Sequence, residues 1–230
     1  MKLYFAGAFT GYKVDKLQSL GMRNKLYSFH HEKNLAREWG KGLLLDSGAY
    51  TASTKGVVID MDELNEFILE VKPDHSIQLD VIGDSKGTWE NYKKQSKVVE
   101  VLPVIHSNYT KSEIARVLES SDYICLGAIN YLPVVKVIEW LDYMFSFPQI
   151  RGKKIHLLGI MSRRILTRYP VYSADSSSAL SAIRYPAGTQ IGKYNQRTKH
   201  YTTFYEEPIK EQLEYEQTLT ELWQKKGITF

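Results

Sequence analysis

The stretch Gly42-Leu43-Leu44-Leu45-Asp46-Ser47-Gly48 holds the pattern that decides the fold. Its three consecutive leucines leave no polar face, which is typical of a strand that is buried on both sides. Such strands occur in parallel sheets whose faces are covered by helices. The polar residues that follow the leucines indicate that the strand ends there and that the chain turns.

The same pattern recurs along the chain, where short apolar runs alternate with amphipathic stretches. We predict strands at residues 3–6, 25–28, 42–45, 76–81, 102–105, 123–126, 155–159 and 171–174. We predict helices at residues 31–39, 61–71, 88–101, 112–119, 134–145 and 163–169, and a terminal helix at 206–226. Eight strands with helical crossovers favour an α/β fold, a compact (β/α)8 barrel of the TIM type in which residues 1–230 form a single domain. An open doubly wound sheet is the main alternative.

The composition is that of an ordinary globular protein, with 43% hydrophobic and 24% charged residues in a chain of 230. No apolar run approaches the roughly 18 residues that a membrane span needs, so we expect no membrane partner. Residues 1–7 predict a first strand and not a signal peptide. The single cysteine, Cys125, excludes an internal disulfide and a multi-cysteine zinc site. A cytoplasmic, reducing compartment is the simplest interpretation.

The formal net charge of +4 hides an asymmetry between two parts of the chain. Residues 149–205 contain ten Lys and Arg residues and one acidic residue, Asp175, whereas the remainder is net acidic. A basic segment beside a net acidic remainder indicates a surface that binds a polyanion, although a solvated surface would have the same composition.

Polar residues and glycines follow six of the predicted strands. In a barrel the carboxyl ends of the strands share one rim, where active sites are built. Each residue alone is equally explained by a helix cap or a turn, but their repetition predicts a common pocket. The candidates are Asp46, Ser47, Gly48, Asp80, His106, Gly127, Gly159 and Asp175.

Two carboxylates across a pocket can divide the work of exchanging an N-glycosidic bond. One attacks the anomeric carbon as a nucleophile, and the other moves protons to and from the leaving and entering bases. Asp80 or His106 could hydrogen-bond the edge of a purine, and a backbone partner would satisfy His106 equally well. The glycines would let a flat base approach the backbone, unless they serve only the turns. The loops contain no phosphate-binding or dinucleotide-binding fingerprint.

The order of these segments resembles that of the tRNA-guanine transglycosylases, and above all of their short phage-type relatives, the 7-deazaguanine DNA transglycosylases. The resemblance covers roughly residues 1 to 180. It implies a barrel without a cofactor, with Asp175 as nucleophile, in the segment Tyr172-Ser173-Ala174-Asp175, and Asp46 as acid/base residue, in Leu45-Asp46-Ser47-Gly48. It also implies substrate-binding roles for the polar residues and turns after strands four to six: Asp80, His106 and Gly127.

Two departures from the family pattern bear on the substrate. Ala49-Tyr50-Thr51 stands where the family has Gly-Phe-Gln, and the cysteines of the structural zinc site that helps tRNA enzymes to bind tRNA are missing. We therefore expect DNA as the polymer and a free 7-deazaguanine base, such as preQ0 or preQ1, as the second substrate. A tRNA transglycosylase, a non-catalytic barrel that only binds nucleic acid and an unrelated barrel hydrolase are the alternatives. The basic residues that we expect to bind phosphates are Arg163, Arg164, Arg184, Lys193, Arg197 and Lys199.

Overall fold

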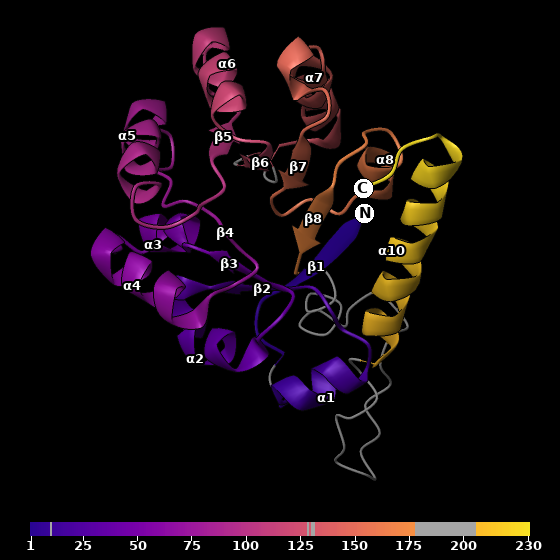
Figure 1. The fold of residues 1–230 in the computed structure, drawn as a ribbon. Helices are drawn as coiled ribbons and strands as arrows, with labels where there is room; N and C mark the ends of the chain where they lie inside the picture. Colours follow the sequence, from indigo (N-terminus) through magenta and orange to yellow (C-terminus); the bar gives the residue numbers. More distant parts are fainter. Residues whose placement is uncertain (10, 128, 130–131, 178–205) are drawn as a thin grey trace.

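The computed structural model describes residues 1–9, 11–127, 129, 132–177 and 206–230, and its centre is one sheet of eight parallel strands (Figure 1). The sheet order is β4-β3-β2-β1-β8-β7-β6-β5, so each strand except those at the two edges lies beside its neighbours in sequence, with β1 joining β8. The strands are β1 Lys2–Ala6, β2 Lys25–Ser28, β3 Leu43–Asp46, β4 His75–Ser76, β5 Val104–His106, β6 Tyr123–Gly127, β7 Lys154–Leu157 and β8 Ser173–Ser176.

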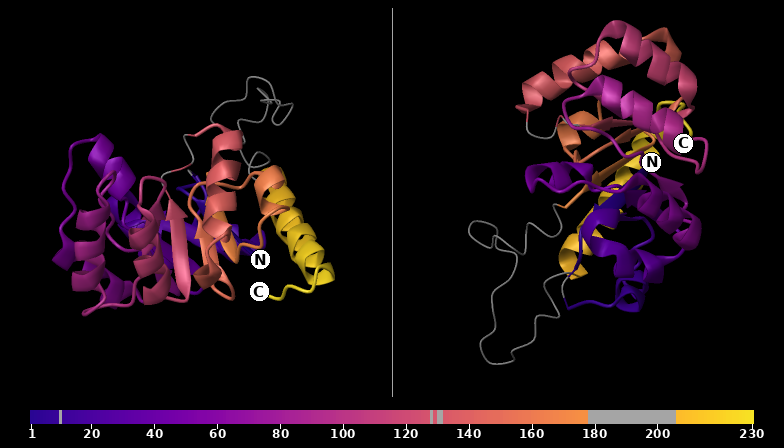
Figure 2. Two further views of the ribbon diagram at one scale, coloured as in Figure 1. Left: turned by 90° about the horizontal axis from the view of Figure 1, so that it is seen from above. Right: turned by 90° about the vertical axis from the view of Figure 1, so that its left-hand side faces the viewer.

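Helices connect the strands and lie on the outer side of the curled sheet (Figure 1). They are α1 Val14–Ser19, α2 Phe29–Trp39, α3 Ala49–Thr54, α4 Met61–Val71, α5 Ser85–Gln95, α6 Lys111–Ser120, α7 Val134–Phe145, the 3-10 helix η1 Pro148–Ile150, α8 Arg163–Leu166 and α10 Glu206–Lys225. Figure 2 shows the two chain ends close together beside α10. The α10 side chain of Glu216 accepts a hydrogen bond from the Leu3 amide at 2.6 Å, which ties this helix to β1.

Leu43, Leu44 and Leu45 of β3 are all at most 1% exposed, which confirms that this strand is buried on both faces. Leu44 belongs to a cluster made of strand residues and residues next to the strands, which fills the concave side of the sheet. Leu43 and Leu45 pack instead with residues of α2 and α4. The alternation follows from the period of two in a strand.

The prediction of a strand at residues 76–81 was wrong in its extent, because β4 ends at Ser76. Beyond it, side chains replace the backbone ladder. The Gln78 Oε1 atom accepts a hydrogen bond from the Val104 amide at 3.1 Å, and the Gln95 Oε1 atom accepts one from the Leu79 amide at 2.9 Å. Because these backbone amides are satisfied by side-chain amides, no regular pairing continues there.

The edge strands β4 and β5 are consequently not paired with each other, and the sheet is curled without being a closed barrel of paired strands. One isolated parallel bridge, between Ile77 and Leu102, links the two edges. The eight parallel strands and their alternation with helices are as predicted, whereas the ladder expected between strands four and five is reduced to this bridge.

Asp84 begins helix α5, because its side chain accepts hydrogen bonds from the amides of Lys86 and Gly87 at 3.0 Å each. Thr110 and Glu113 form a capping box at the start of α6. Asp84 is therefore a helix cap.

Within the described residues, no helix has the length and apolar character needed to cross a membrane. Cys125 is a buried free thiol on the concave side of the sheet.

Candidate active site

The predicted site residues come together at the carboxyl edge of the sheet. Asp46 is the last residue of β3, His106 is the last residue of β5, and Asp175 lies in β8. His106 and Gly127 are register partners on neighbouring strands. Asp80 and Asp175 are both near enough to Asp46 to raise the pKa of its carboxyl group. Residues distant in sequence thus share one electrostatic environment at this edge.

Asp175 is 6% exposed and is held through one of its two oxygens. The Oδ1 atom accepts a hydrogen bond from the Gly159 amide at 2.8 Å and lies 3.2 Å from the His156 Nε2 atom. Gly159, at a φ of 70°, therefore orients the carboxylate with its backbone. Among the described residues, both hydrogen-bond contacts of this carboxylate fall on Oδ1 and none on Oδ2.

Asp46 has the electrostatics of an acid/base group. Burial, together with the charges of Asp80 and Asp175, raises the pKa of Asp46 from 3.8 to about 7. A hydrogen bond from the Gly48 amide to Oδ2, at 2.9 Å, opposes this shift without cancelling it. A carboxyl group with a pKa near neutrality can both donate and accept a proton under ordinary conditions.

Ser47 and Gly48 shape the turn that presents Asp46. Ser47 is fully buried, and its Oγ atom accepts a hydrogen bond from the Ala49 amide at 3.3 Å at the start of α3. Gly48 has a φ of 81°, and a Cβ atom there would lie 2.4 Å from the Ser28 Oγ atom. The missing side chain of Gly48 is thus required by the packing of α3 against the β2–α2 junction. A contact of Ser47 or Gly48 with a base stays a prediction.

Gly48→Ala is expected to destabilise the fold by about 2–4 kcal/mol, because it combines a left-handed backbone with a steric clash. Gly56→Ala is the matched control: its φ is 66°, but nothing lies within 4 Å of the added methyl group. It should cost only the backbone strain, about 1–2 kcal/mol. Chemical denaturation of both variants measures the difference. Equal losses of unfolding free energy in the two variants would mean that the contact with Ser28 does not contribute to the destabilisation.

Asp80 and His106 form a second pair. The His106 Nε2 atom lies 2.8 Å from the Asp80 Oδ2 atom, and the His106 side chain is 2% exposed. The other ring nitrogen, Nδ1, is buried with no hydrogen-bond partner in the part of the chain that the structure describes. Because buried polar atoms are normally satisfied, Nδ1 is a candidate for a hydrogen bond to a ligand or a water molecule. Gly127 lies beside the ring, since a Cβ atom there would be 3.6 Å from His106 Cδ2.

A cavity of about 250 Å³ has Asp80 in its wall, whereas Asp46, His106 and Asp175 do not line it. The rest of the wall is mostly apolar and comes from α3, the segment after it and the segment after β4, including Ala49, Ala52, Leu79, Val81 and Ile82. An apolar wall beside one carboxylate suits a flat heterocycle with a polar edge.

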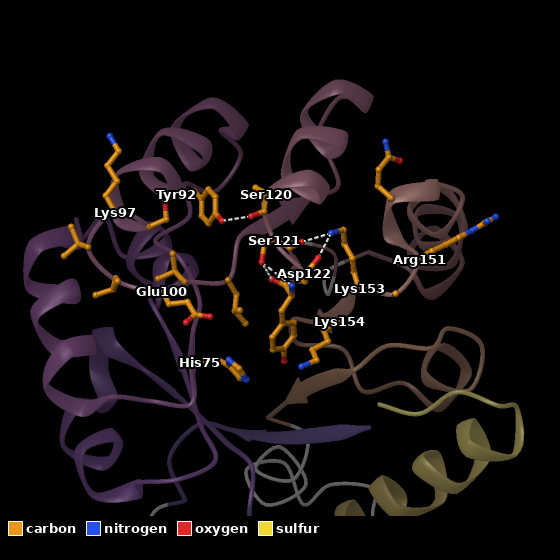
Figure 3. A pocket seen from close by; sticks show the side chains of 18 residues that line it. His75, Tyr92, Lys97, Glu100, Ser120, Ser121, Asp122, Arg151, Lys153 and Lys154 are labelled. Atoms are coloured by element: carbon orange, nitrogen blue, oxygen red, sulfur yellow. Dashed lines mark hydrogen bonds and ion pairs between the residues drawn. The ribbon is translucent and has the colours of Figure 1, made fainter.

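A larger cavity, of about 960 Å³, lies at the opposite, amino-terminal ends of the strands (Figure 3). It is lined by His75 of β4 and Lys154 of β7, together with exposed cations such as Lys97 and Arg151. None of the residues predicted for catalysis or substrate binding lines it.

Arg163 and Arg164, of the six predicted phosphate-binding residues, lie exposed on α8. Arg184, Lys193, Arg197 and Lys199 lie outside the described residues. No group of three or more His, Cys, Asp or Glu side chains in the described ranges is arranged to hold a metal ion.

Sequence reasoning missed two buried residues near the site. His156, fully buried in β7, contacts Asp175. Lys25, also fully buried, donates from Nζ to the Phe5 carbonyl oxygen at 2.7 Å and to that of Gly7, which fixes the end of β1. Burial lowers the pKa of Lys25 to about 7, against the opposing charges of Glu32 and Asp175. The only available signal was a charged or polar residue inside an otherwise apolar strand.

No protein-family model matches the chain, and the search of curated proteins finds no match.

Proposed function

We propose that the protein is a DNA transglycosylase, which exchanges guanine in DNA for a free 7-deazaguanine base through a covalent intermediate on Asp175. The observation that carries the proposal is the unequal environment of two neighbouring carboxyl groups. Asp175 is fixed through one oxygen, whereas Asp46 has its pKa raised to about 7. Pairs of titratable groups with divergent environments are typical of acid/base and nucleophile assignments.

In the first half of the reaction, Asp175 Oδ2 forms a bond to C1′ of the nucleotide while the bond from C1′ to guanine breaks. Asp46, in its protonated form, donates a proton to the departing guanine. In the second half, Asp46 takes the proton from the incoming base, which bonds to C1′ and displaces the Asp175 carboxylate. The proton count balances over the cycle and no other reactant is needed.

The base to be exchanged must leave the DNA stack, which costs a few kcal/mol. The cavity beside Asp80 supports this step, because its apolar wall offers a surface for an extruded ring. The Asp80 carboxylate and the unsatisfied Nδ1 of His106 offer an acceptor and a second polar contact for the purine edge. Asp80 would accept from the amino and imino groups of guanine.

We also propose that the fold corresponds to a (β/α)8 barrel whose fourth and fifth strands meet only through a bridge and a side-chain contact. The bridge between Ile77 and Leu102 joins the edges of the sheet, and the side chain of Gln78 continues the link to Val104. A barrel would place the ends of all eight strands on one rim, as the reaction requires.

The direct test uses a DNA duplex and a single strand that carry radiolabelled guanine, incubated with the protein and with unlabelled preQ0 or preQ1. We expect labelled guanine to be released over multiple turnovers only when the free base is present, since without it release stops at formation of the covalent intermediate, and the mass of the oligonucleotide to change accordingly. Release from tRNA alone would replace DNA by tRNA as the polymer. Absence of release from every substrate would overturn the proposal.

Binding of DNA should depend steeply on salt, because neutralised phosphates release counterions. Each contact lowers log K by about 0.9 per log unit of salt on duplex DNA. Arg163→Ala/Arg164→Ala should therefore flatten the slope by about 2 if both arginines contact phosphates. Fluorescence anisotropy at several salt concentrations measures the slope.

The matched control is Lys97→Ala/Arg151→Ala, which removes the same charge at the opposite ends of the strands (Figure 3). It should leave the slope nearly unchanged. An equal effect of both pairs would show that DNA binding depends on the overall charge and not on a defined surface of the protein. Tighter binding of tRNA than of DNA would contradict the DNA assignment.

A further inference from the structure

A hydrogen-bonded network of buried polar side chains runs through the interior of the sheet and ends on Asp175. The Tyr123 hydroxyl lies 2.7 Å from the Ser173 Oγ atom, and this oxygen lies 2.7 Å from the His156 Nδ1 atom. The other ring nitrogen, Nε2, lies 3.2 Å from Asp175 Oδ1. Ser173 and His156 are fully buried, and Tyr123 is 7% exposed.

The side chains of this network come from three adjacent strands, and the register of these strands fixes their positions. His156 of β7 is the register partner of Cys125 in β6 and of Ser173 in β8. The ring of Tyr4 packs edge-on against the imidazole, with 5.8 Å between centroids, and Tyr4 is itself the register partner of Asp175. Packing on several sides therefore holds the plane of the imidazole ring.

A carboxylate can only accept hydrogen bonds, and the proposed reaction uses Asp175 as a carboxylate, which gives the hydrogen bonds a direction. With neutral His156, Nε2 must carry the proton to donate to Asp175, and Nδ1 must then accept from the Ser173 hydroxyl. Ser173 in turn accepts from the Tyr123 hydroxyl. Every donor then points toward the carboxylate, and donors aligned in this way reinforce one another in a buried site.

The end of this network that is distant from Asp175 lies at the larger of the two cavities. Tyr123 lines the cavity of about 960 Å³ at the amino-terminal ends of the strands, where its ring packs edge-on against His75. The polar groups thus extend from that cavity to the opposite rim. A purely structural core would place apolar side chains at these positions, because each buried polar group costs free energy unless it is paired.

We propose that His156 is a positioning residue for Asp175, held in the Nε2–H tautomer by Ser173 and Tyr123. Together with the Gly159 amide it fixes Oδ1 and directs Oδ2 toward the anomeric carbon. The catalytic consequence rests on the proposed function, whereas the tautomer and its dependence on Ser173 do not.

The first test is independent of activity. In protein labelled with ¹⁵N-histidine, long-range ¹H–¹⁵N spectra should show His156 protonated on Nε2 only. Ser173→Ala removes the donor to Nδ1 and should change the His156 signals, whereas His75→Phe, which keeps an aromatic ring beside Tyr123 and removes only the imidazole nitrogens, should not. A proton on Nδ1, or an unchanged spectrum in Ser173→Ala, would overturn the proposal.

The second test uses exchange kinetics. His156→Leu removes the donor and should lower kcat by about 100-fold with little change in KM, as expected for misplacement of a reacting group. His156→Gln can still donate from its amide nitrogen and should recover a substantial part of kcat at similar stability. His75→Phe should retain wild-type kcat.

The outcomes separate the two proposals. If the wild-type protein exchanges no base, the proposed function fails, and the tautomer is judged by the spectra alone. If the wild type is active and His156→Leu retains its kcat, His156 does not position Asp175. The same conclusion follows if folded His156→Gln has no higher kcat than His156→Leu.

Discussion

Asp175→Asn is expected to abolish base exchange, by roughly 10⁴-fold or more, while the protein stays folded. The amide is a far weaker nucleophile than the carboxylate, so no glycosyl bond to C1′ forms. The Asn oxygen can still accept from the Gly159 amide, as Asp175 Oδ1 does at 2.8 Å. The measurement is release of radiolabelled guanine, combined with a denaturing gel on which only the wild type carries a covalent DNA adduct.

Asp122→Asn is the control for this experiment. It removes the same charge from a side chain that is 99% exposed at the start of β6, away from the candidate site. Exchange by this variant should equal that of the wild type. Near-normal turnover in folded Asp175→Asn would remove Asp175 as the nucleophile, whatever the identity of the substrate.

The sequence predicted most of the architecture, because burial and periodicity are local properties. The strand at residues 25–28 and the helices at 61–71 and 134–145 have the predicted bounds. The extent of β4 was not predictable, because it depends on hydrogen bonds that backbone amides of other segments donate to the side-chain oxygens of Gln78 and Gln95. A polar side chain in a sequence gives no sign of which distant backbone group it will bind.

The candidate site was predictable only where it follows the strand-end pattern. Asp46, His106 and Asp175 follow that pattern, and the structure brings them to one edge. His156 does not, because a histidine inside an apolar strand looks like any core residue until its neighbours on β8 are known. Lys25 was missed for a related reason, since lysine at the start of a strand is usually exposed, whereas here it is fully buried.

The electrostatics of the site predict opposite effects on function and stability at Asp46. Asp46→Asn should lower exchange strongly, because the variant neither protonates guanine nor accepts a proton from the incoming base. In the wild type, release of guanine should fall as the pH rises through about 7, where Asp46 loses its proton. Binding of DNA should change little, since Asp46 is expected to act on the base.

The same substitution, Asp46→Asn, should increase the free energy of unfolding. The pKa of Asp46 is raised in the folded state from 3.8 to about 7, so folding becomes less favourable as the pH rises between these values, and the full cost persists above the upper one. Asn carries no charge, so the variant does not lose stability in this way, and its side-chain oxygen can still accept a hydrogen bond from the Gly48 amide. The variant should therefore gain stability over the wild type, and the gain should be about 1–2 kcal/mol larger at about pH 8 than at about pH 5. Urea denaturation of both proteins at the two pH values measures it. A gain that is independent of pH, or a variant less stable at about pH 8, would mean that Asp46 is not a carboxyl group held near neutrality by Asp80 and Asp175, and its role as the acid/base residue would lose its physical basis.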